Sequence, residues 1–303
     1  TGGYIIKIDK LTDGTAEDKW CSGFKRFNNT SLCFQYHYPE TEDMNEEQKY
    51  YIENFIETTL GDIYESRENE EDIFYVESIN ALSFVDYFII AELSKNIDAY
   101  RLSTFLYKDS DENFGKLNIG PVWDYNLAYG NVNYCDGFKT SGWLLHESNE
   151  CRGGIPAFWI DLIKNSSFSE ELIERWFSLR QDILSTDNIL SQIDEIAIQL
   201  DEPKNRNFEK WDILDEYVWP NYQLSGSYQG EIEFLKYWIF ERLNWIDGSI
   251  YNTSELLGLC TSNEKELIQI SDPLGRGVSN QNGQVLFYIY DNGCIEKKFI
   301  TYN

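Results

Sequence analysis

The sequence predicts an α+β protein in which strands and a hairpin come first, a helical region follows, and a small β-rich module comes last. Three observations predict this order. Strand-like apolar runs lie near the amino terminus and within 101–123. Apolar residues recur at helical spacing in 43–60, in 83–93 and through much of 155–247. The residues after 265 are again rich in β-forming types.

The first half of the chain alternates between these two patterns. Residues 4–9 are β-rich, and we expect them to pair with 34–38. An apolar stripe at 43–60 predicts an amphipathic helix that Gly61 ends. A second helix is predicted at 83–93, where the apolar pattern stops at Ser94.

The second half is predicted to be a helical layer followed by a separate module. Helices are expected within 155–199, at 206–219 and at 230–247, and their many aromatic residues favour a packed core over a cofactor site. The composition changes near Gly248. We therefore expect three parts, namely a domain at 1–248, a linker at 249–264 and a small β-rich module at 265–303.

The charge of the chain limits its partners. A formal net charge of −27 argues against nucleic acid, because phosphate-binding surfaces are basic. No run of about 18 apolar residues occurs, so we expect no membrane insertion. Basic or neutral protein partners are compatible with the charge, and so is an acidic surface that serves only solubility.

The six cysteines form three sequence-local couples: Cys21 with Cys33, Cys135 with Cys151, and Cys260 with Cys294. There is no CxxC and the sequence has only two histidines, which argues against a zinc site. Disulfides in an exported protein are one explanation. Buried free thiols in a cytosolic protein are the other.

Two aspartates bracket the predicted hairpin. The strand-like segments 101–108 and 116–123 are separated by a turn-prone run, so their open ends should lie side by side. Asp98 precedes the first segment and Asp124 follows the second, which should bring them together. Two carboxylates in this arrangement suit metal-dependent phosphoryl transfer, in which one orients the acceptor hydroxyl and the other holds Mg²⁺. Ordinary helix-end and turn residues are the alternative.

Motifs in this region resemble the CotH kinase family: Asn96-x-Asp98, Ser103-Thr104-Phe105-Leu106-Tyr107-Lys108-Asp109 and Gly120-Pro121-x-Trp123-Asp124-Tyr125-Asn126-x-Ala128-x-Gly130-Asn131. The resemblance covers roughly residues 1–248. It implies an atypical protein-kinase-like fold with a helical carboxy-terminal lobe, and the transfer of the γ-phosphoryl group of ATP to a protein with Mg²⁺ or Mn²⁺. The cysteine couples support a secreted or cell-surface location.

The same resemblance assigns roles to individual residues. Asp98 matches the catalytic aspartate and Asp124 the metal-binding aspartate. Ser103 stands where kinase catalytic loops carry a metal-binding asparagine, which puts a second metal position in doubt. Asn126 either binds the metal or makes a turn hydrogen bond. The β-rich tail resembles the sorting or adhesion-like modules of secreted Bacteroidetes proteins, which implies a secreted member of that type.

Neighbouring residues are expected to support the site. Asn96 belongs to the motif, and Glu92 and Lys95 either form a surface ion pair or order the Asp98 loop. Trp123 should anchor the hairpin in the core. Within the loop 133–154, Trp143 and His146 indicate either peptide docking or only a disulfide-pinned surface loop.

Three functional classes stay open: an active secreted kinase, a pseudokinase that binds a partner, and a cell-surface adhesion protein. Kinases hold the nucleotide phosphates with a lysine. The resemblance places that lysine upstream of Gly2-Gly3, so we do not expect it in this chain. Lys7 and Lys10 are unconvincing substitutes.

Overall fold

The computed structural model describes residues 2–10, 15–66, 77–113, 115–145, 151–251, 266–271, 277–278, 285–290 and 295–299. It confirms the α+β class: a five-stranded antiparallel sheet lies beside α-helices, and a three-stranded sheet follows. Short 3₁₀ turns connect the elements at Ala16–Asp18, Thr41–Asp43, Asp111–Asn113 and Arg152–Gly154. No helix in the described ranges is long and apolar enough to cross a membrane.

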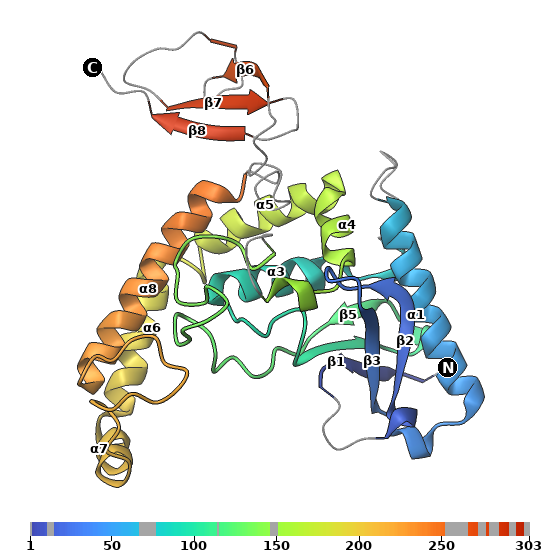
Figure 1. The fold of residues 1–303 in the computed structure, drawn as a ribbon, viewed down its shortest axis with the longest axis horizontal. Helices are drawn as coiled ribbons and strands as arrows, with labels where there is room; N and C mark the ends of the chain where they lie inside the picture. The colour runs from blue at the N-terminus through green and yellow to red at the C-terminus, as the bar shows by residue number, and fades with distance from the viewer. Residues whose placement is uncertain are drawn as a thin grey trace.

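The five-stranded sheet has the order β2-β3-β1-β4-β5 (Figure 1). Its strands are β1 (Tyr4–Ile8), β2 (Lys19–Lys25), β3 (Ser31–Tyr38), β4 (Thr104–Lys108) and β5 (Leu117–Ile119). β1 is the central strand, because it pairs with β3 on one side and β4 on the other, and its alternate residues are buried. The predicted pairing of the first strand with the 34–38 region is confirmed.

Two helices of the described ranges precede the hairpin. α1 (Glu46–Ser66) continues beyond Gly61, so the predicted helix end was wrong. The apolar stripe goes on through buried Ile63, and this burial outweighs the weak helix preference of one glycine. α3 (Ala81–Ser94) is joined to β5 at its start, where the Asn80 amide donates a 2.8 Å hydrogen bond to the Leu117 carbonyl.

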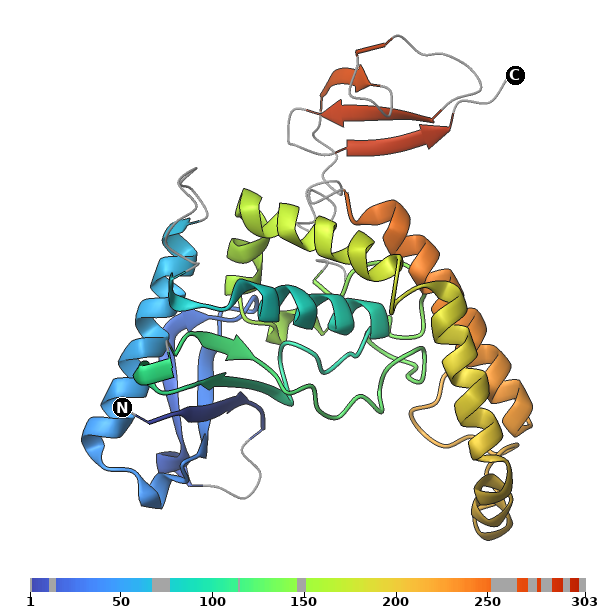
Figure 2. The same cartoon turned by 180° about the vertical axis from the view of Figure 1, so that it is seen from behind.

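The helical region contains α4 (Phe158–Lys164), α5 (Ser166–Arg180), α6 (Thr186–Gln199), α7 (Asp201–Lys210) and α8 (Tyr228–Ser249). Figure 2 shows α6 and α8 side by side at the end of the molecule opposite α1. The helix predicted at 206–219 was wrong, since α7 ends at Lys210 and no helix forms over 211–219. Trp159 on α4 is fully buried against Tyr87 and Tyr100, which joins α4 to the hairpin region.

The carboxy-terminal strands β6 (Leu267–Ser271), β7 (Val285–Tyr290) and β8 (Ile295–Phe299) form a separate antiparallel sheet in the order β6-β7-β8. This agrees with the strands predicted there. The proposed domain and linker boundaries stay predictions.

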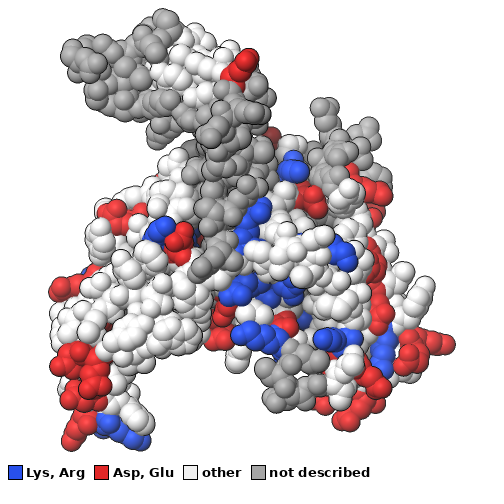
Figure 3. All heavy atoms as spheres, in the orientation of Figure 1, with Lys and Arg blue, Asp and Glu red and all other residues white. Residues whose placement is uncertain are grey.

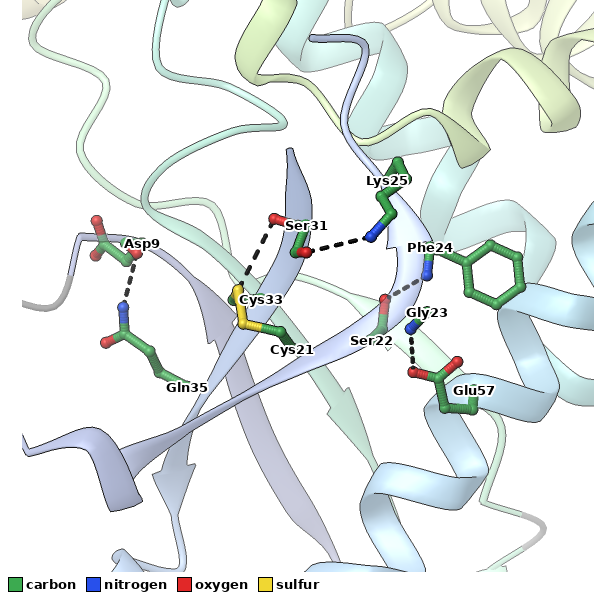
Figure 4. Close-up of a disulfide and its surroundings, with 10 residues drawn as sticks. All are labelled: Asp9, Cys21, Ser22, Gly23, Phe24, Lys25, Ser31, Cys33, Gln35 and Glu57. Carbon is green, nitrogen blue, oxygen red and sulfur yellow. Dashed lines mark hydrogen bonds between the residues drawn. A yellow bond between two sulfur atoms is a disulfide. The ribbon is translucent and has the colours of Figure 1, made fainter. Parts of the chain in front are cut away.

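Two of the three expected disulfides are present. Cys21–Cys33 joins β2 to β3 (Figure 4), and Cys135–Cys151 closes the segment after the hairpin. Cys260 and Cys294 lie outside the described residues. The alternative of buried free thiols is therefore wrong for the four described cysteines.

Candidate functional site

The loop that carries Asp98 begins where α3 ends. Lys95 has left-handed backbone angles (φ 49°, ψ 43°) and turns the chain away from the helix axis. The Ser94 carbonyl then accepts a 2.7 Å hydrogen bond from the Tyr129 amide, and the Ile97 amide donates to the Leu127 carbonyl at 3.4 Å. The loop after α3 therefore lies directly beside the loop that carries Asp124.

The buried Asn96 side chain connects the two loops. Its Nδ2 donates to the Asp124 carbonyl at 3.4 Å, and its Oδ1 accepts from the Asp98 amide at 3.2 Å. One amide group thus contacts the backbones of both candidate site residues, which are 26 positions apart in the sequence.

The hairpin between these loops has shorter strands than the sequence predicts. β4 starts only at Thr104 because Tyr100 and Ser103 have positive φ angles (70° and 48°), which are incompatible with an extended strand. Beyond β5, Trp123 is 63% exposed, so the expectation that it anchors the hairpin in the core was wrong. β5 ends at Ile119, and within the described ranges residues 121–123 belong to no strand.

Asp98 is half-buried and forms an ion pair with Arg101. The Arg101 Nη2 contacts Asp98 Oδ1 at 2.6 Å, while Arg101 Nε donates to the Ile97 carbonyl at 2.8 Å. This fixes one carboxylate oxygen and leaves Oδ2 without a hydrogen bond to the described part of the chain. Burial raises the pKa of the nearby Tyr134 hydroxyl, and the negative charge of Asp98 raises it further.

Asp124 differs from Asp98 in that its side chain is exposed. Its φ is 62°, and its carboxylate makes no hydrogen bond or ion pair with other described residues. Asn126 is exposed close by, and Ser103 is half-buried. No group of three or more His, Cys, Asp or Glu side chains that could hold a metal gathers in the described regions. Magnesium sites on substrate phosphates need only one or two carboxylates, so an unpaired Asp124 fits such a site.

Glu92 and Lys95 are both 1% exposed, so the surface ion pair, one of the two alternatives for these residues, was wrong. Glu92 instead pairs with Arg242 of α8, whose Nη2 lies 3.3 Å from Glu92 Oε2. The Glu92 carboxylate also accepts hydrogen bonds from the Leu144 amide and the Tyr100 hydroxyl. Burial raises the pKa of Glu92, and the nearby positive charge of Arg242 opposes this shift.

Two buried cations hold the segment 139–142. Lys95 Nζ donates to the carbonyls of Lys139 and Ser141, and Arg242 Nη1 donates to those of Thr140 and Gly142. Four consecutive carbonyls are therefore fixed behind the Asp98 loop. Burial lowers the pKa of Lys95 to about 7 and that of Arg242 to about 10.

Trp143 belongs to the core rather than to a docking surface. It is 2% exposed and contacts the ring of Trp245 on α8. The loop before it stacks Tyr134 on Trp219 and Phe138 on Tyr222. His146 lies outside the described residues.

Sequence reasoning missed the two arginines that organise the site. Arg101 follows Asp98 by three positions, a spacing that allows a contact within one turn. Arg242 lies on the same helical stripe as Trp238 and Ile246, four positions away on each side. An arginine on an apolar helical stripe indicates a buried ion pair. The sequence spacing does not identify Glu92 as its partner.

A comparison with protein families finds a match over most of the chain. The model of the family described as CotH kinase protein matches residues 1–246, which is most of the chain. The chain belongs to the CotH kinase family. A search of curated proteins found no match to it. In this CotH kinase family member, the loops of Asp98 and Asp124 contain the motifs that resemble the family, and the Asn96 side chain joins those loops.

Proposed function

We propose that this protein has a kinase-like fold and transfers the γ-phosphoryl group of ATP to a hydroxyl of a protein, with Mg²⁺ or Mn²⁺. Membership of the CotH kinase family supports this reaction class. The observation that carries the proposal is the Asn96 amide, which holds the Asp98 and Asp124 loops at one place.

The two aspartates take different roles. The exposed Asp124 carboxylate, which has no partner among the described residues, would bind the metal ion together with the Asn126 amide. The Ser103 hydroxyl is a weaker candidate ligand. When bound, the metal would neutralise charge on the ATP phosphates. Asp98 would orient the acceptor hydroxyl through Oδ2, because Arg101 already occupies Oδ1.

Two observations favour a second candidate function. Arg101 already neutralises the charge of Asp98 in an ion pair. Ser103 stands where kinase catalytic loops carry a metal-binding asparagine. Both features are compatible with a pseudokinase that keeps the fold and binds a surface partner without transferring phosphate.

We also propose that the protein works outside the cytosol. Its two described disulfides support this location, because such bonds persist in oxidising compartments.

A phosphate-transfer assay on the full-length protein tests the proposal. Asp98→Asn should slow transfer by about 10²–10⁴-fold while ATP binding stays unchanged, since its task arises only as the hydroxyl attacks. Asp124→Asn should abolish transfer together with the metal-dependent part of ATP binding. Asp212→Asn, at an exposed position on the loop after α7, is the matched control and should behave as wild type.

The outcomes separate the candidates. Transfer at the wild-type rate in Asp98→Asn contradicts the assigned role of Asp98. Wild-type protein that binds ATP but transfers no phosphate to any hydroxyl indicates the pseudokinase. Thermal melting of each variant shows whether a loss reflects the site or the fold.

A further inference from the structure

A cavity of about 790 Å³ lies between β2, the carboxy-terminal part of α1, and α4. None of its lining residues comes from the Asp98 or Asp124 loops, so it is separate from the candidate phosphotransfer site. Its volume is in the range of pockets that enclose small ligands or a few side chains.

The walls of the cavity combine aromatic rings with positive charges. Phe24, Phe27 and Phe158 supply apolar surface from β2, the turn after it and α4. Figure 4 shows the Phe24 ring turned toward α1, next to Lys25 on the same strand. The Arg152 guanidinium carbon lies 3.8 Å from the centre of the Phe27 ring.

The positive charges are unusual in this chain, which has 25 Lys and Arg against 52 Asp and Glu. Lys25, Arg152 and Lys164 all line the cavity, against two acids, Glu65 and Asp161. Figure 3 shows Lys and Arg atoms gathered near the middle of the displayed face, while acidic atoms dominate its edges. Within the described ranges, Lys25 Nζ donates one hydrogen bond, to the Ser31 hydroxyl at 3.2 Å, and Lys164 forms no ion pair.

Gly61 lines the cavity without adding a side chain to it. It lies inside α1, where glycine costs about 1 kcal/mol relative to alanine. A Cβ at this position would meet no atom within 4 Å, so neither packing nor backbone angles require glycine here. A larger side chain at this position would project into the space that Gly61 borders.

The cavity is also preformed. Its β2 wall is joined to the start of α4 by the Ala157 amide, which donates to the Lys25 carbonyl at 3.0 Å, and by a bridge between Arg26 and Pro156. Glu57 of α1 accepts a 2.9 Å hydrogen bond from the Gly23 amide (Figure 4). Because these walls are already held in place, less conformational entropy is lost when a ligand binds.

We propose that this cavity docks an acidic polypeptide segment, with an aromatic side chain among the phenylalanines and carboxylates against Lys25, Arg152 and Lys164. Charge complementarity favours this occupant, since the cavity is lined by three cations against two acids in a chain whose net charge is −27. Three cations are too few to hold a nucleic acid backbone at physiological salt. The docking goes beyond the proposed phosphotransfer and needs no ATP.

Fluorescence anisotropy with a labelled Glu-Glu-Phe-Glu-Glu peptide, without nucleotide, tests the proposal on the full-length protein. Gly61→Leu should weaken binding at least about tenfold, because the leucine side chain would occupy the cavity. Its matched control is Gly248→Leu in α8, where a Cβ also meets nothing within 4 Å but which does not line this cavity. Both variants replace a helical glycine by a better helix former, so neither should melt earlier.

Charge is tested separately. Lys164→Glu should weaken binding, and more strongly at low salt, whereas Lys210→Glu on α7 makes the same charge change away from the cavity and should have no effect. A Lys-Lys-Phe-Lys-Lys peptide should not bind. Equal binding to wild type and Gly61→Leu, equal binding of the acidic and basic peptides, or no binding of the acidic peptide at millimolar concentration overturns the proposal.

Discussion

Removing the Arg242 guanidinium should destabilise the protein more than the loss of any surface ion pair. Arg242 is 0% exposed and donates to the Glu92 carbonyl and carboxylate and to the carbonyls of Thr140 and Gly142. Arg242→Met keeps much of the side-chain volume but leaves the Glu92 charge buried without its main cation. Breaking a buried pair in this way costs about 3–5 kcal/mol.

Equilibrium urea unfolding measures this cost as a change in the unfolding free energy at constant slope. Arg206→Met is the matched control, because Arg206 and Glu202 pair on an exposed helix face, where such pairs are worth about 0–1 kcal/mol. Adding Glu92→Gln to Arg242→Met should recover part of the loss, since no buried charge is then stranded. Equal destabilisation by Arg242→Met and Arg206→Met would refute the structural role of the cluster.

Three further predictions concern single features. An unfolded lysine titrates near 10.5, whereas folded Lys95 titrates near 7, so the unfolded chain binds more protons between these pH values. The unfolding free energy of wild type should therefore rise with pH across this window relative to Lys95→Met, and parallel pH profiles would contradict the shift. Replacing Cys135 and Cys151 by alanine should cost on the order of 3 kcal/mol in urea unfolding, because the bond closes a 16-residue separation; an unchanged midpoint would contradict this. Trp123→Ala should shift the unfolding free energy by less than about 0.5 kcal/mol, since the side chain is exposed, and a cost near that of a core tryptophan would show that it is buried in solution.

The sequence predicted the features that are formed by residues close together in the chain. The hairpin and its flanking aspartates follow from strand patterns and a turn close together in the chain, and the structure brings their loops together. The two described disulfides join cysteines 12 and 16 positions apart, so proximity in sequence was enough to pair them.

The errors arise where a distant partner decides the environment of a residue. Glu92 and Arg242 are 150 positions apart, and only the packing of α3 against α8 makes both buried. Gly61 was expected to end a helix, but the burial of Ile63 extends it. Trp123 was assigned to the core by its residue type, although it lies beyond the end of β5 and its side chain is exposed.

Calorimetric binding of ATP with Mg²⁺ to the full-length protein, compared with its Asp124→Asn variant, tests the central claim most directly. If the Asp98 and Asp124 loops form a phosphotransfer site, wild type binds ATP with Mg²⁺ more tightly than without it. In Asp124→Asn that metal-dependent gain is lost, while the melting temperature stays the same because the side chain is exposed. A metal-dependent gain of the same size in both proteins, or no ATP binding by wild type with Mg²⁺ or Mn²⁺, contradicts the claim.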